Sequence, residues 1–382
     1  MRYRQFGKLE FKTSALGFGA MRLPTLPKTG EIDEPLAISM IRTAIDHGVN
    51  YVDTAYSYHD HQSEILVGKA LKDGYRQKTA VATKMPSWLI KDTADLDRYF
   101  NEQLAKVDVE KFDFYLLHAL SADRWETYKR IKVFDWIERQ KANGKIGAIG
   151  FSFHDEYPVF EEIIHGYDAW DFCQIQYNYM DTDYQAGERG LKLAADRGLG
   201  VIVMEPLRGG GLARNPMPDA VDHVFKRSGR DWTPAEWALQ WVWDQPEVSL
   251  LLSGMSTMQQ VEQNLVSASR SGIGSLSRAD QIIIEEVRDA FQSLVPIPCT
   301  TCGYCQPCPQ DVLIPNIFSI YNESIMYDNQ GNGQWRYGNI KPENRADQCV
   351  ECGECEAACP QHIEIIDWLK TAHTYLSRSS QS

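Results

Sequence analysis

The chain has 382 residues, of which 43% are hydrophobic, so it is long enough for two domains with a sizeable core. Its 39 basic and 52 acidic residues give a net charge of −13 without any lysine–arginine cluster, which argues against nucleic acid and anionic membranes as partners. No apolar run reaches membrane-spanning length and the N-terminus lacks the apolar core of a signal peptide, so we expect a cytoplasmic protein.

Roughly the first 270 residues repeat one pattern, in which a short apolar strand is followed by an amphipathic helix and then by a glycine. Gly48, Gly144 and Gly198 each follow a helical stretch, where glycine adopts the left-handed conformation at low cost. A later helix is expected after Thr233, which forms a capping box with Glu236. The predicted strands are Ala15–Gly19, Val49–Val52, Thr79–Thr83, Phe112–Leu117, Ile146–Phe151, Phe172–Gln176, Gly200–Met204 and Val248–Leu252.

These alternating elements predict an α/β fold, a (β/α)8 TIM barrel followed by a small, mainly helical domain. A doubly wound open sheet is the alternative, but no G-x-G-x-x-G turn follows the first strand, so a Rossmann nucleotide site is not supported. A helix over Arg278–Leu294 ends the first domain, which we expect to span residues 1–294, with the second over 295–382. The second domain is expected to contain helices over Ile314–Met326 and Ile363–Leu376 and a polar loop over Asp328–Gln334.

Ionisable residues follow three consecutive predicted strands, at Asp53, Lys84 and His118, and Tyr58 lies five residues after Asp53. The chemistry of a TIM barrel takes place at the C-terminal ends of its strands, where these four side chains could converge. We expect Asp53 to orient Lys84, whose charge lowers the pKa of Tyr58, so that Tyr58 acts as general acid or base. His118 would then aim a substrate oxygen. The alternative is a structural Asp–Lys ion pair with two unrelated rings.

Eight of the nine cysteines form two blocks between Cys299 and Cys359. The second block matches the bacterial ferredoxin pattern C-x2-C-x2-C-x3-C-P, and the first departs from it by one residue. In two-cluster ferredoxins the fourth cysteine of each block ligates the other cluster. This rule predicts two [4Fe–4S] clusters, one held by Cys299, Cys302, Cys305 and Cys359 and one held by Cys349, Cys352, Cys355 and Cys308.

Other interpretations of the cysteines stay open. The cysteines could hold one cluster instead of two. They could also form all-cysteine zinc sites, but the third evenly spaced cysteine of each block would then be unexplained. Disulfides are a third possibility, which a reducing compartment disfavours. The ninth cysteine, Cys173, lies in an apolar run and is expected to be a small buried hydrophobe.

The motifs resemble those of a known family. The segment Asp53–Tyr58 (Asp-Thr-Ala-Tyr-Ser-Tyr), followed by Ser63-Glu64 and Gly68, resembles the aldo-keto reductase signature, and Lys84 and His118 match the rest of its catalytic tetrad in order. The whole chain looks like the branch of that superfamily with a C-terminal 4Fe–4S ferredoxin-type domain. The resemblance implies an oxidoreductase that uses NAD(P)H to interconvert an aldehyde or ketone and an alcohol, with Tyr58 as the general acid.

The same resemblance implies a cofactor site. Ser152 and Gln174 match residues that hold the nicotinamide carboxamide, although Phe153 replaces the usual asparagine. Gln260 stands near the adenine, where many NADPH-specific members carry a basic residue, so NAD(H) is an open alternative. Leu207–Gly211 resembles the loop beside the pyrophosphate, with a flexible glycine turn as the alternative. The other implied cofactor residues are Gly19, Met21, Arg22, Met204, Leu207, Gly209 and Asn264.

Nicotinamide transfers two electrons as a hydride, whereas an iron–sulfur cluster transfers one, and no flavin motif that would join the two is recognisable. The clusters could relay electrons to a redox partner protein, could be structural, or could belong to a partner-binding protein whose barrel is not catalytic. Neither the small carbonyl or alcohol substrate nor the oligomeric state can be read from the sequence. We expect the loops Pro86–Asp92 and Ser121–Glu126 to shape the substrate pocket.

Overall fold

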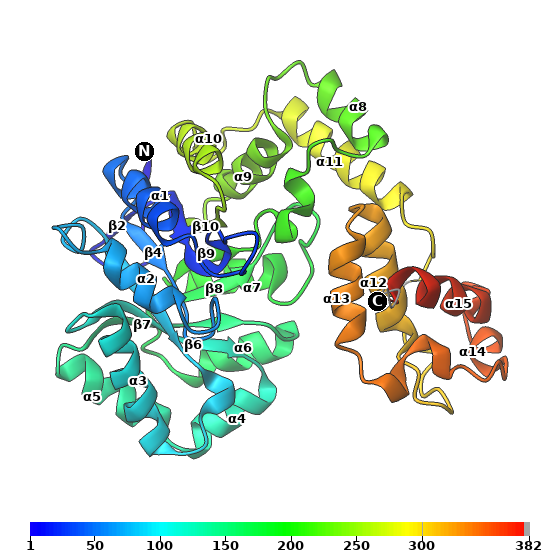
Figure 1. The fold of residues 1–382 in the computed structure, drawn as a ribbon, viewed down its shortest axis with the longest axis horizontal. Coiled ribbons are helices and arrows are strands. Elements are labelled where there is room, and N and C mark those ends of the chain that lie inside the picture. The colour runs from blue at the N-terminus through cyan, green and yellow to red at the C-terminus, as the bar shows by residue number, and fades with distance from the viewer. Residues whose placement is uncertain (300, 378–382) are drawn as a thin grey trace. The chain divides into compact units, whose positions relative to one another are not determined.

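The computed structural model describes residues 1–299 and 301–377, which form two compact units (Figure 1). The barrel unit comprises Met1–Gly209 and Trp232–Ser277. The cysteine unit comprises Gly210–Asp231 together with the chain from Arg278 onward. Packing therefore groups a segment after the seventh barrel strand with the C-terminal part of the chain. The predicted division into domains over residues 1–294 and 295–382 stays a prediction, because compact units defined by packing need not be domains that fold separately.

The barrel unit is built on a closed parallel barrel in the order β10-β3-β4-β5-β6-β7-β8-β9. This closure confirms the predicted TIM barrel and excludes the open sheet. Each predicted strand has an observed counterpart, and the bounds agree within a few residues. The strands are β3 (Leu16–Gly19), β4 (Tyr51–Asp53), β5 (Ala80–Met85), β6 (Phe112–Leu120), β7 (Ile146–Phe153), β8 (Phe172–Gln176), β9 (Gly200–Met204) and β10 (Leu250–Gly254).

Helices surround these strands (Figure 1). Gly48, Gly144 and Gly198 have φ angles of 96°, 68° and 74°, the left-handed conformation predicted for them. The Thr233 side chain accepts a hydrogen bond from the Glu236 amide, as expected for the capping box. The helices are α1 (Glu34–Asp46), α2 (Ser63–Ala70), α3 (Thr93–Val107), α4 (Ala122–Arg130), α5 (Val133–Ala142), α6 (Tyr157–Gly166), α7 (Gly187–Asp196), α9 (Pro234–Asp244) and α10 (Met258–Ser269).

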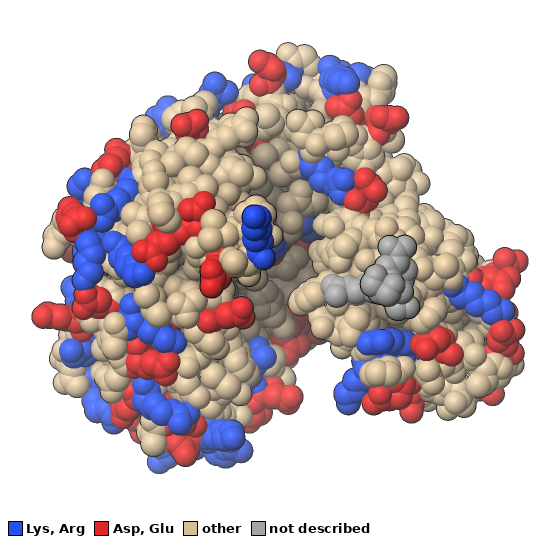
Figure 2. Space-filling model, in the orientation of Figure 1, with Lys and Arg blue, Asp and Glu red and all other residues tan. Residues whose placement is uncertain are grey.

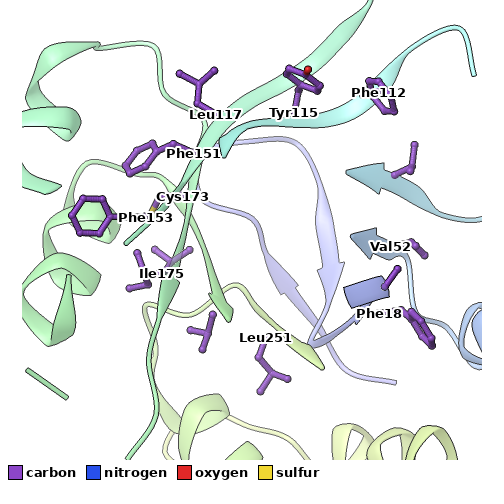
Figure 3. Packing of buried hydrophobic residues seen from close by; sticks show 14 of the residues in the cluster. Phe18, Val52, Phe112, Tyr115, Leu117, Phe151, Phe153, Cys173, Ile175 and Leu251 are labelled. Carbon is purple, nitrogen blue, oxygen red and sulfur yellow. The ribbon is translucent and has the colours of Figure 1, made fainter. Parts of the chain in front are cut away.

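Side chains alternate along the strands between two hydrophobic layers. The outer layer lies between strands and helices and includes Phe151, Leu251 and Cys173, which is fully buried as predicted (Figure 3). The inner layer fills the barrel and consists of Phe6, Tyr51, Ala82, Phe114, Leu116, Ala148, Phe172, Ile202, Leu250 and Leu252.

One end of the barrel is filled by a hairpin that the sequence analysis did not predict. Its strands are β1 (Tyr3–Gln5) and β2 (Lys12–Ser14), and Phe6 between them lies 5.0 Å from the ring of Phe114. A Cβ atom on Gly200 would come within 2.5 Å of the Phe6 ring, so only glycine allows this approach. Because this plug occupies the N-terminal end, inward-facing polar side chains are accommodated at the C-terminal ends of the strands.

The cysteine unit has its own small core, centred on α12 and α15. Asn322 anchors the preceding linker, because its side chain exchanges hydrogen bonds of 3.1 and 2.7 Å with the backbone of Ile297. The helices of the unit are α8 (Asp219–Arg227), α11 (Arg278–Ser293), α12 (Ile314–Met326), α13 (Gln330–Gly338), α14 (Glu354–Ala357) and α15 (Ile365–Leu376).

Two predicted loops are wrong. The segment Asp328–Gln334 leads into α13, which begins at Gln330 because the Asn329 side chain caps it by accepting from the Asn332 amide. The segment Ser121–Glu126 is mostly the first half of α4. In both cases a polar helix was mistaken for a loop.

Acidic and basic side chains are interspersed over the visible face of the molecule (Figure 2). In the part of the chain that the structure describes, no helix is both long and apolar enough to cross a bilayer.

Candidate active site

The predicted site residues occupy the next inward position beyond the inner hydrophobic layer. Asp53 follows the inward Tyr51 by two residues, Lys84 follows Ala82, and His118 follows Leu116. Since every second strand residue faces inward, these polar side chains form one layer at the C-terminal ends of the strands. Ser152, Gln174 and Met204 occupy the equivalent positions on β7, β8 and β9.

The lysine lies at the centre of this layer. Its ammonium group donates hydrogen bonds to Asp53 Oδ1 at 2.5 Å, to the Thr54 carbonyl at 2.8 Å and to the Tyr58 hydroxyl at 3.3 Å. All three protons of Lys84 are therefore used, and its direction is fixed. Burial raises the pKa of Asp53 and pulls that of Lys84 down, but Asp53 and Tyr58 together raise the pKa of Lys84 above its ordinary value.

Exposure divides the four residues into two pairs. Asp53 and Lys84 are only 2% and 1% exposed, whereas Tyr58 and His118 are partly exposed. The rings of Tyr58 and His118 lie 6.0 Å apart at 82°. The buried pair therefore supports the two rings that reach the mouth of the barrel, and those rings are the groups that a substrate could meet.

The expected acidification of Tyr58 is corrected by the structure. Burial raises the pKa of Tyr58 above its ordinary value, and the nearby charge of Lys84 opposes this rise without reversing it. The phenol is thus protonated at neutral pH. Because Lys84 donates to the phenol oxygen, the phenol's own proton stays available for donation to another group.

The histidine is neutral. Burial, reinforced by electrostatic repulsion from Lys84 and by contributions from His154 and Arg124, holds the pKa of His118 well below its ordinary value. Its Nδ1 atom is buried and has no hydrogen-bond partner among the described residues. A neutral imidazole offers one donor and one acceptor, so His118 can hydrogen-bond a carbonyl or hydroxyl oxygen.

The residues implied for the nicotinamide fit an amide group. Gln174 Oε1 is buried and has no partner in the described chain, while Gln174 Nε2 lies 3.6 Å from the sulfur of Met204. Ser152 accepts a hydrogen bond of 2.7 Å from the Ala119 amide, which leaves its own proton free to donate. One acceptor and one donor therefore lie on neighbouring strands, and a carboxamide needs this combination.

The residues implied for the rest of the dinucleotide lie around β3, β9 and β10. Gly19 ends β3, and Met21, in the following turn, is 53% exposed. Asn264 is buried and donates to Ser253 at 3.0 Å. Gln260 accepts from the Ser256 amide at 2.8 Å. Both side chains therefore shape the end of β10.

The loop expected beside the pyrophosphate holds an internal anion. The Gly209 amide donates to the carboxylate of Glu205, and Glu205 also lies 3.9 Å from Arg22. Leu207, between them in sequence, packs against the outer layer of the barrel. A phosphate at this amide would have to replace Glu205, so the loop fits a pyrophosphate less well than the strand ends fit a carboxamide.

Several residues at the site escaped sequence reasoning. Besides Glu205, they are the Thr54 carbonyl, Trp88, whose ring lies 5.1 Å from that of His118, and Arg124. A backbone carbonyl leaves no sequence signal. Trp88 and Arg124 fall in the two segments expected to shape the pocket, although neither was singled out.

In the cysteine unit the two blocks adopt the same turn. The residue before the second cysteine of each block, Thr301 or Glu351, has φ of 55° or 58°. The glycine that follows the second cysteine, Gly303 or Gly353, has φ of 77° or 78°. The odd spacing of the first block comes later, so it does not disturb this turn.

The cysteines line two hollows. One is lined by Cys299, Cys302, Cys305 and Cys359, and the other by Cys308, Cys349, Cys352 and Cys355, with Cys305 at the boundary. None of the nine cysteines forms a disulfide bond. Within residues 1–299 and 301–377, no three His, Cys, Asp or Glu side chains converge as they would around a single ion. Thiolates spread around a hollow suit a four-iron cube, each of whose corners takes one ligand, better than one zinc ion.

Comparisons with known proteins agree with both units. Residues 15–273 match the aldo/keto reductase family, and residues 298–364 match a 4Fe-4S dicluster domain. Since the first match spans more than half of the chain, the protein belongs to the aldo/keto reductase family. It is an oxidoreductase with a C-terminal 4Fe–4S-binding domain, as the resemblance predicted.

Relatives share the barrel at modest identity. A probable aldo-keto reductase 1 from Glycine max is 28% identical over 77% of this chain and 88% of that protein. The NADH-specific methylglyoxal reductase of Escherichia coli (strain K12) is 26% identical over 75% and 98%. The solved structure of aldo-keto reductase AKR11C1 from Bacillus halodurans (holo form) superposes with a TM-score of 0.62 at 26% identity, covering 75% and 96%.

Proposed function

We propose that the protein interconverts an aldehyde or ketone and an alcohol with NAD(P)H, using Tyr58 as the proton donor. The observation that carries this proposal is the placement of the Lys84 ammonium within hydrogen-bonding distance of Asp53, Thr54 and Tyr58 at once. A structural ion pair would not need a third bond to a partly exposed phenol.

In the direction of reduction, Tyr58 gives its proton to the carbonyl oxygen while Lys84 stabilises the phenolate that forms. His118, neutral and beside Tyr58, holds the same oxygen. A bound nicotinamide supplies the hydride to the carbonyl carbon, or accepts it from the alcohol in the reverse reaction. Ser152 and Gln174 would hold its carboxamide, since Ser152 has a hydroxyl proton to donate and Gln174 Oε1 has no partner among the described residues.

We propose two [4Fe–4S] clusters with interleaved ligands, one in each hollow. Cys305 and Ile314 line both hollows, which indicates that the two hollows are neighbours. Clusters so arranged can pass electrons singly to a redox partner protein. Thiolate ligands and free cysteines favour a reducing compartment, so we further propose a cytoplasmic location.

The experiment that tests the catalytic proposal compares the wild type with Tyr58→Phe. Steady-state reduction of a panel of aldehydes and ketones is measured with NADH and with NADPH, together with nucleotide binding by fluorescence. We expect the variant to lose about 10²–10⁴-fold in turnover, the usual contribution of general acid catalysis, while it still binds the nucleotide. Equal turnover by both forms would refute the role of Tyr58.

A further inference from the structure

An arginine stands beside the candidate site without an acidic partner. Arg124, in the first turn of α4, donates from Nη1 to the Ala119 carbonyl. It forms no ion pair in the part of the chain that the structure describes. Several arginines of the barrel unit do form ion pairs, such as Arg76 with Asp113 at 2.8 Å and Arg139 with Asp97 at 3.2 Å. Arg124 is only partly exposed, and its charge lies close enough to His118 to lower the pKa of that imidazole.

The backbone of β6 links this arginine to the site. Ala119 directly follows His118 and has φ of 52°, the left-handed conformation, within a register shift of β6 between Leu117 and Leu120. The Ala119 amide donates to Ser152, and its carbonyl accepts from Arg124. One strained residue therefore connects His118, a candidate cofactor residue and Arg124.

An aromatic side chain lies between Arg124 and His118. The guanidinium carbon of Arg124 is 5.8 Å from the centre of the Trp88 ring, and that ring is 5.1 Å from the ring of His118. Trp88 is 41% exposed, although its ring is large and apolar. Its position is held from α4, because Tyr128 donates to the neighbouring Ser87 at 2.9 Å. The arrangement is an apolar ring with the imidazole of His118 at one end and the guanidinium of Arg124 at the other.

The N-terminus of α4 is not itself the anion site. The Ala122 amide donates to Asp155 Oδ2 at 2.8 Å, and the other oxygen of Asp155 accepts from the Glu156 amide at 2.8 Å. This carboxylate is therefore held by backbone amides. Among the described residues Arg124 donates only from Nη1, which leaves its Nε and Nη2 edge, two parallel N–H groups whose spacing matches the two oxygens of a carboxylate.

We propose that the Nε–Nη2 edge of Arg124 binds the carboxylate of an acidic carbonyl substrate, with Trp88 packed along the carbon chain that links this carboxylate to the reacting carbonyl. The inference rests on the proposed function, because it assumes that the carbonyl reacts at Tyr58 and His118. It narrows the substrate class from aldehydes and ketones in general to those that carry a carboxylate at their far end.

The test uses substrates that differ only in charge. Succinic semialdehyde and adipic semialdehyde are compared with their amides, in the wild type and in Arg124→Gln, Arg124→Lys and the control Arg130→Gln. Arg130 is an exposed arginine at the other end of the same helix. We expect Arg124→Gln to lower kcat/KM for a semialdehyde about 10–100-fold, the loss typical of a hydrogen bond to a charged group, and to leave the amides unchanged. Arg124→Lys should restore part of the loss, and Arg130→Gln should have no effect.

Two results would overturn the inference. One is a wild type that uses acids and amides equally well. The other is an Arg124→Gln enzyme that is slowed equally on both, which would mean that Arg124 only supports Ala119. If the wild type turned over none of these compounds, the proposed function would fail separately. Calorimetry with succinate and succinamate would then test the anion site by itself. Binding of succinate that is weakened by Arg124→Gln supports the site, and binding that is the same in wild type and Arg124→Gln refutes it.

Discussion

The barrel mouth and the cysteine hollows both gather reactive side chains, but they are stabilised in different ways. Lys84 is almost completely buried and is held by three bonds to other parts of the protein. The cysteines lie on short left-handed turns around two hollows, beside a small core. The comparison teaches that the barrel builds its site from its own contacts, whereas we expect the cysteine unit to depend also on the group that its thiolates would bind.

Loss of one cluster ligand should have the largest effect. Cys355→Ser removes a thiolate from the second hollow, so we expect the iron content to fall from about eight per chain, the value for two cubes, and residues 278–377 to become sensitive to protease. Iron and sulfide are assayed anaerobically, and proteolysis is followed by mass spectrometry.

The matched control is Cys173→Ala, which deletes the buried thiol of the barrel. It should retain the full iron content and lose only about 1 kcal/mol of stability. If Cys355→Ser kept its iron and its protease resistance, the cluster would not be what holds this unit together.

The next largest effect is expected from changes to the Asp53–Lys84 pair, which distinguish its role in catalysis from its role in stability. Lys84→Met leaves the buried carboxylate of Asp53 without its partner, which should cost about 3–5 kcal/mol of unfolding free energy as well as most of the turnover. Adding Asp53→Asn removes the unpaired charge, so the double variant should regain much of the stability, measured by denaturant titration, but not the turnover. A double variant that regained both would show that the pair is purely structural.

The dependence on pH follows from the protonated phenol. Because the pKa of Tyr58 is raised above its ordinary value of about 10, reduction should stay constant through neutral pH and decline only in strongly alkaline solution. Oxidation of the alcohol needs the phenolate, so its rate should rise with pH over the same range. Turnover at saturating substrate, measured in both directions, checks this. A decline of reduction already near neutrality would contradict the assigned protonation state.

The smallest effect concerns the choice of nucleotide. Gln260→Arg adds a cation near the expected adenine end and should tighten NADPH relative to NADH by about tenfold, the value of one charge-assisted hydrogen bond. Gln259→Arg, at the neighbouring exposed position, is the matched control and should leave the ratio unchanged. If both variants shifted the NADPH-to-NADH affinity ratio equally, Gln260 would not lie beside the 2′-phosphate that distinguishes NADPH from NADH.

The features predicted from the sequence are those set by local patterns. Strand periodicity located the barrel, and the polar residues that end three strands do lie in one layer. The cysteine spacing predicted which residues line each hollow. Each of these depends on residues close together in the chain or on the regular geometry of a parallel barrel.

The features that were missed depend on contacts between distant segments. The strands beside Phe6 are too short to show alternation, and only the barrel interior explains that side chain. Glu205 faces Arg22 because of a left-handed backbone at residue 205, which no pattern signals in a glutamate. The net pKa of Tyr58 depends on burial, so the charge of Lys84 alone led to the wrong direction.

The central proposal is that a nicotinamide bound in the barrel transfers its hydride directly to the carbonyl carbon. The most direct test incubates the protein with a carbonyl substrate and a nicotinamide nucleotide that carries deuterium at its reacting carbon, and analyses the alcohol by mass spectrometry. The account predicts that the wild type places deuterium on the carbinol carbon and that Tyr58→Phe forms almost no alcohol. Alcohol that formed with its hydrogen drawn from solvent would contradict the account, because the electrons would then have travelled singly.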